Sequence, residues 1–140
     1  MNTKLVMVSS AAILGLAGIL LSFFPSEIAP YLDLSVNQPI VLQILGALYF
    51  GFAILNWTAK ANLIGGIYSK PVAIGNFAHF MMGALALAEL AFNTTGLTHV
   101  WIAAIIYSIF TLIFGYIFFM NPLGKKNTSI NKQAVNAWAK

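Results

Sequence analysis

The sequence has no cysteine, no arginine and only three acidic residues among its 140 residues. Without cysteine there can be no disulfide, thiolate metal site, cysteine nucleophile or cysteine-linked lipid. A nucleic-acid surface needs a continuous basic face, usually with arginine, so we expect no nucleic-acid partner. Charged residues make up 7% of the chain, against about 25% in a typical soluble domain. So few charges cannot keep a surface solvated in water, which indicates a membrane protein.

Hydrophobic residues account for 60% of the chain, and the mean hydropathy is +0.87. They gather in four apolar segments, each close to the ~20 residues that cross a ~30 Å hydrocarbon core as a helix. The segments cover residues 5–24, 40–58, 72–92 and 98–120, with a proline near an end of each. We predict an all-α, polytopic membrane protein with four transmembrane helices in an up-down bundle at 1–124, and a short basic tail at 125–140.

Lysine is distributed unevenly between the two ends of these segments. Lys4 precedes the first segment, Lys60 and Lys70 flank the connection between the second and third, and the remaining lysines lie in the tail. The connection after the first segment has two acidic residues and no lysine, and the connection at 93–97 has no charge. Because connections rich in lysine stay in the cytoplasm, we predict that both termini and the middle connection are cytoplasmic.

Small residues indicate where helices approach closely in lipid, because association there depends on van der Waals contact. The first segment carries four of them on one helical face, and the second and third carry three each. They are Ala11, Gly15, Gly18 and Ser22; Gly46, Gly51 and Ala53; and Gly75, Gly83 and Ala86. The fourth segment is bulky and aromatic, and we expect it to show the most surface to lipid or to a partner.

Several polar residues lie near the predicted cytoplasmic end of the helices. Asn76 and His79 share one face of the third segment, and Asn56 lies at a matching depth on the second. A hydrogen-bonded group can join them to a serine of the first segment or to Tyr116 of the fourth. One interpretation is interhelical packing. The other is a site that binds a lipid or quinone-like molecule or handles protons, with His79 as the titratable group.

Glu89 is the carboxylate that lies inside a predicted helix, about one turn from the outer boundary. It is ten residues beyond His79, roughly 15 Å along the helix, so the two side chains cannot meet directly. Glu89 either reaches the outer headgroups or acts as a protonatable relay within the bundle, where Gln43 lies at a similar height. A channel or transporter that used Glu89 would require a homo-oligomer.

Metal, haem and catalytic sites have no support in the sequence. The two histidines, His79 and His99, lie at different depths, and no cluster of three or four ligands is present. No serine, histidine and acidic residue share a height, and the glycine pair at 65–66 lacks a phosphate-loop pattern. We therefore predict no metal, no cofactor and no catalytic residue.

The connection at 25–39 and the C-terminal tail each allow two interpretations. The connection at 25–39 is either a short interfacial helix or a loop folded over the outer helix ends. In the tail, Ile130, Ala134 and Trp138 recur at helical spacing among lysines. This pattern fits either a short helix on an anionic membrane surface or a disordered polar tail.

The layout resembles the DoxX-like group of small four-helix bacterial membrane proteins. The likeness lies in the proline-ended first segment and in the runs LGALYFGFAILNW at Leu45–Trp57 and GNFAHFMMGALAL at Gly75–Leu87. The resemblance implies an accessory protein of a bacterial cytoplasmic membrane, and it assigns no functional residue. We therefore expect a non-enzymatic accessory or assembly partner of another membrane protein, with the lipid- or proton-handling role as the alternative.

Overall fold

The computed structural model describes residues 2–32, 39–60, 70–94 and 98–120, and over these ranges the regular structure is helical throughout. The elements are α1 (Thr3–Phe23), α2 (Pro25–Ile28), the 3₁₀ helix η1 (Ala29–Leu32), α3 (Ile40–Ala59), α4 (Lys70–Asn93) and α5 (Thr98–Met120). Helices α1, α3, α4 and α5 are each long and apolar enough to cross a membrane. The described part of the chain is therefore all-α, and its four long apolar helices indicate a multi-pass membrane protein.

Prolines explain where two of these helices begin. Helix α4 starts at Lys70, two residues before the predicted start, because Pro71 lies in the first turn. The amide N–H that proline lacks has no partner within the helix at that position, so proline is tolerated there. Pro25 likewise opens α2, directly after the backbone N–H of Phe24 has closed α1 on the carbonyl of Leu20.

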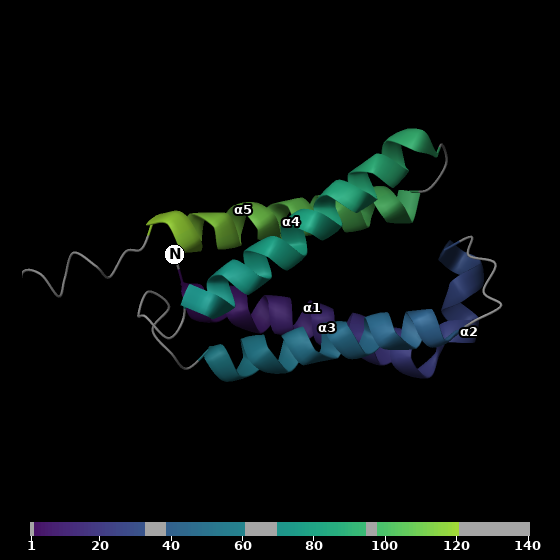
Figure 1. The fold of residues 1–140 in the computed structure, drawn as a ribbon, viewed down its shortest axis with the longest axis horizontal. Coiled ribbons are helices and arrows are strands. Elements are labelled where there is room, and N and C mark those ends of the chain that lie inside the picture. Colours follow the sequence, from purple (N-terminus) through teal and green to yellow (C-terminus); the bar gives the residue numbers. More distant parts are fainter. Residues whose placement is uncertain (1, 33–38, 61–69, 95–97, 121–140) are drawn as a thin grey trace, which may run out of the picture. The chain divides into compact units, whose positions relative to one another are not determined.

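The chain divides into two compact units, Met1–Asn62 and Leu63–Lys140. In the first unit, α1 and α3 form an antiparallel pair (Figure 1). The pair crosses closely at glycines: a Cβ added to Gly18 would lie 2.7 Å from the backbone nitrogen of Phe50. A Cβ on Gly46 would collide with Ser22. Small residues thus bring the two backbones together, as their spacing predicts.

The connection after α1 folds back onto the end of this pair. Ala29 of η1 is buried with Leu21 of α1 and Leu42 of α3, and Ile28 packs against the same cluster. Of the two interpretations of this connection, its described part has features of both: it is helical, and it covers the helix ends. Residues 33–38 lie outside the described part of the chain.

In the second unit, α4 and α5 form an antiparallel pair around Phe80 (Figure 1). The Phe80 ring is fully buried and stacks on Phe110 and Phe114, with ring centroids 4.8 and 5.6 Å away. Glycines make room for other rings, since the Tyr107 ring packs directly against Gly83. The sequence predicts that the fourth segment shows the most surface to lipid or to a partner, yet Phe110 and Phe114 of α5 are buried and form the core of this pair.

Candidate functional site

Asn56 links the two long helices of the first unit through a buried polar contact. Its side-chain amide Nδ2 donates a hydrogen bond of 3.1 Å to the hydroxyl of Ser10, so the bond links α3 to α1. The Ser10 hydroxyl in turn donates to the carbonyl of Met7, at 3.1 Å. Asn56, Ser10 and Met7 are all fully buried. Of the serines considered from the sequence, Ser10 is thus the partner of Asn56, whereas Ser9 bonds the carbonyl of Val6 in its own helix.

Asn76 and His79 lie on α4, in the second unit. Asn76 is buried, and its Nδ2 donates to the carbonyl of Val72 at 2.9 Å. The half-buried ring of His79 lies 5.9 Å from the ring of Tyr107 on α5, centroid to centroid. The predicted hydrogen-bonded group is thus divided between the two units: Asn56 belongs to the first, and Asn76 and His79 belong to the second.

Tyr107, rather than Tyr116, is the tyrosine beside His79. Tyr116 is 53% exposed, whereas the Tyr107 ring lies between His79 and Gly83 on the α4 face. The spacing of His79 and Gly83 in the sequence is consistent with this contact. His79 and Gly83 are four residues apart and so share a helical face, and a glycine on that face leaves space for a ring.

The acidic and histidine side chains near the other helix ends are exposed. Glu89 of α4, Gln43 of α3 and His99 of α5 are all exposed within their own units. Close by, the rings of Phe92 and Trp101 meet edge to face across the α4–α5 end, with centroids 5.2 Å apart. Among the described residues, no three histidine or acidic side chains are grouped to hold a metal ion.

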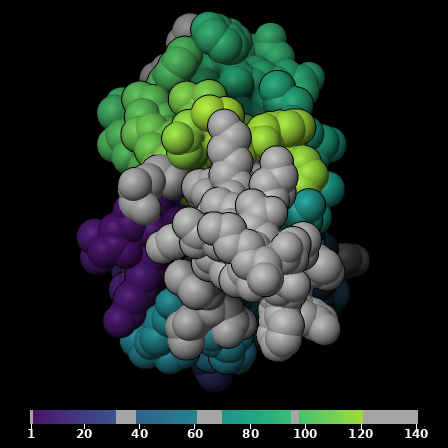
Figure 2. All heavy atoms as spheres, turned by 90° about the vertical axis from the view of Figure 1, so that its left-hand side faces the viewer, coloured from purple at the N-terminus to yellow at the C-terminus, as the bar shows by residue number. Residues whose placement is uncertain are grey.

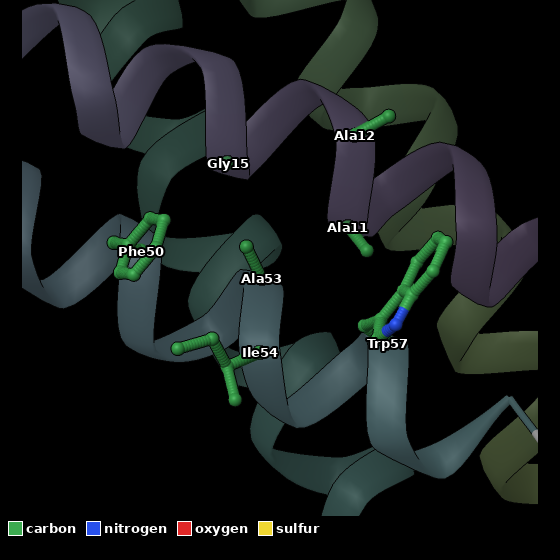
Figure 3. Close-up of a pocket in the computed structure, with 7 residues that line it drawn as sticks. All are labelled: Ala11, Ala12, Gly15, Phe50, Ala53, Ile54 and Trp57. Carbon is green, nitrogen blue, oxygen red and sulfur yellow. The ribbon is translucent and has the colours of Figure 1, made fainter.

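Two apolar grooves follow the seam between α1 and α3. The first, which we call the Trp57 groove, has a volume of about 230 Å³ (Figure 3). It is lined by Ala11, Ala12, Gly15, Phe50, Ala53, Ile54 and Trp57. The second has a volume of about 440 Å³ and lies beyond Phe50, toward Phe23. Sequence reasoning did not identify these grooves, although the small residues Ala11, Gly15 and Ala53 are the reason that space remains there.

The Trp57 groove ends beside Lys60. The ammonium Nζ of Lys60, the residue that caps α3, lies 2.7 Å from the centroid of the Trp57 ring, a cation–π contact. Partial burial lowers the pKa of Lys60 below its ordinary value of 10.5, and the positive charge of Lys4 lowers it further. The start of α1 and the end of α3 lie together at this end of the first unit (Figure 2).

The polar contacts and the grooves of the described residues are structural features of the two helix pairs. The buried amides are used in hydrogen bonds within helices or between them. The grooves on the first unit are apolar and open along one seam. In comparisons with protein-family models, with curated proteins and with solved structures, the chain has no match.

Proposed function

We propose that this protein is a non-enzymatic accessory or assembly partner of another protein in a bacterial cytoplasmic membrane. In this proposal the four long helices form an up-down bundle with both termini in the cytoplasm. The distribution of lysines supports the orientation. The resemblance of the runs Leu45–Trp57 and Gly75–Leu87 to DoxX-like proteins supports the accessory role.

The proposal rests on two observations: the buried polar residues make structural hydrogen bonds, and some small residues lie on open helix faces. The buried side-chain amides of Asn56 and Asn76 donate hydrogen bonds that stabilise the helices. Other small residues remain outside the two helix pairs: over the described ranges, a Cβ added to Gly51 or Gly75 would meet no atom of another residue within 4 Å. Small residues on a membrane helix allow another helix to approach closely. Gly51 on α3 and Gly75 on α4 therefore mark faces on which a helix of a partner protein can pack.

Native mass spectrometry of the tagged protein, extracted in mild detergent from its own membrane, tests this proposal. We expect a membrane protein bound in fixed stoichiometry. The variant Gly51→Leu, or Gly75→Leu on the other unit, should release that partner while the unfolding midpoint of the isolated chain stays unchanged. Recovery of the chain without any partner would contradict the proposal, as would a partner that both variants retain.

A further inference from the structure

The apolar lining of the Trp57 groove is suited to binding a hydrocarbon chain. Its lining consists of alanine, glycine, isoleucine and aromatic residues. Ala11 of α1 and Ala53 and Trp57 of α3 lie toward the space between the two helices (Figure 3). The groove runs from Trp57 to Phe50, seven residues along α3, which corresponds to roughly 10 Å at the rise of an α-helix. Because α1 and α3 are both candidate membrane spans, the groove opens where lipid chains are the surrounding medium.

Two lysines place positive charge at one end of the groove. Lys60 lies one turn beyond Trp57, and its ammonium group is held over the Trp57 ring at the end of the groove. Lys4 lies seven residues before Ala11, so it shares the face of α1 that lines the groove. The start of α1, which carries Lys4, and the end of α3, which carries Lys60, lie together at this end of the pair (Figure 2). Burial and, to a smaller extent, the charge of Lys4 lower the pKa of Lys60. Two positive charges that repel each other attract an anion to the space between them.

Nothing among the described residues of the first unit neutralises this pair. Its described acidic residue is Glu27 of α2, which lies at the opposite end of the α1–α3 pair. Charge complementarity therefore favours an anionic occupant. A second copy of the chain inserted in the same orientation would bring its own lysines to the same level, and like charges there would oppose the contact.

The geometry points to a binding site for one anionic phospholipid, with an acyl chain in the Trp57 groove and the phosphate between Lys4 and Lys60. Hydrocarbon contact alone would not distinguish one phospholipid from another. The two ammonium groups supply the preference for a net negative headgroup, since lysine near a membrane surface attracts anionic lipid. Gly51 and Gly75, on which the accessory role depends, are not among the residues that line this groove.

Lipid titration of the purified full-length chain, followed by native mass spectrometry, tests the site. Phosphatidylglycerol should bind in preference to phosphatidylcholine. Lys4→Gln and Lys60→Gln should each weaken the binding of phosphatidylglycerol about fivefold, the effect expected for one lysine near a membrane surface. Lys70→Gln, the same charge change on an exposed lysine of the second unit, should leave this binding unchanged.

A second pair of variants tests the groove itself. A Cβ on Gly15 would lie 3.4 Å from the Cβ of Ala53, at the lower limit of ordinary contact. Gly15 lines the groove, so the remaining carbons of Gly15→Leu take up space there. We expect it to reduce phosphatidylglycerol binding, whereas Gly51→Leu should not. Glycerol phosphate, which has the headgroup charge without chains, should not compete. Circular dichroism and the unfolding midpoint in phosphatidylcholine identify any variant that is misfolded.

Four results would overturn the inference. Equal binding of the two lipids would remove the role of the lysines. An equal loss with Lys70→Gln and Lys60→Gln would mean that net charge, not this site, attracts the lipid. A dimer that persists without added lipid and that Gly15→Leu abolishes would show that a second copy fills the groove. Competition of glycerol phosphate with phosphatidylglycerol would show that the site binds an anion and does not bind an acyl chain.

Discussion

At the scale of single residues, the buried amide of Asn56 shows how a polar side chain stabilises a membrane helix pair. Its bond to Ser10 connects α3 to α1 through two residues that are 46 positions apart in the chain. A polar group in hydrocarbon needs such a partner, because no water is present to replace it. The bond therefore specifies how α1 and α3 are rotated toward each other, which apolar contacts alone specify less strictly.

We predict that Asn56→Ala lowers the free energy of unfolding by about 1 kcal/mol, the range measured for interhelical hydrogen bonds in membranes. The measurement is equilibrium unfolding in a mixed-detergent titration. Ser10→Ala should lower stability similarly, and the double variant should cost less than the sum of the two. Thr58→Ala is the matched control, because the Thr58 hydroxyl is exposed and bonds carbonyls of its own helix. Additive effects of the two alanine substitutions would argue against a coupled pair.

Phe80 has the corresponding role in the second unit, where aromatic stacking replaces the hydrogen bond. Phe80→Ala removes two stacked contacts, with Phe110 and Phe114, and aromatic pairs contribute about 0.5–1.5 kcal/mol each. We expect a loss of about 1–3 kcal/mol on that basis in the same unfolding experiment. Leu85→Ala on the same helix, at an exposed position, should have a much smaller effect. Equal losses would show that Phe80 is not the centre of this pair.

At the scale of elements, two glycines within α1 and α3 have opposite roles. Gly18 lies at the close crossing, where a Cβ would be 2.9 Å from the carbonyl oxygen of Gly46. Gly51 is exposed, with open space where a Cβ would stand. The contact partner of Gly18 is backbone, which cannot rotate away as a side chain can, so the two helices themselves would have to separate.

Gly18→Ala should therefore destabilise the protein by about 1–3 kcal/mol, the usual cost of overpacking. Gly51→Ala should be neutral or stabilising, because alanine favours the helix and meets no described neighbour. Thermal unfolding followed by circular dichroism compares the two variants. If Gly51→Ala were the more damaging variant, the assignment of the close crossing to Gly18 and Gly46 would be wrong.

At the scale of the whole molecule, the orientation across the membrane is the property that the lysines predict. The chain contains no cysteine, so single cysteines can be introduced without background labelling. Ser26→Cys and Thr94→Cys should react with an impermeant maleimide added outside intact cells. Asn2→Cys should react only after the membrane is made permeable. All three positions are exposed within the units, so failure to label reports location rather than burial. Labelling of Asn2→Cys from outside would reverse the predicted topology.

The sequence alone predicts the four long helices closely, and it predicts the candidate sites only in part. Helix positions follow from the length of apolar runs and from prolines, both of which can be read along the chain. The contact between Asn56 and a serine was among the predicted links, and Ser10 makes it. Tyr107 beside His79 was not predicted. Position along the helices favours Tyr116, whereas the space that Gly83 leaves for the Tyr107 ring depends on how α4 and α5 are rotated toward each other.

What the sequence determined by itself is the class of protein: four helices of membrane-spanning length, closed by local backbone hydrogen bonds. The tertiary structure decided which faces meet. Adjacent residues on a helix point about 100° apart, so a small rotation changes the partner of every side chain. For that reason the close crossing at Gly18 and Gly46, the Phe80 core and the Trp57 groove appear only once each pair of helices is packed.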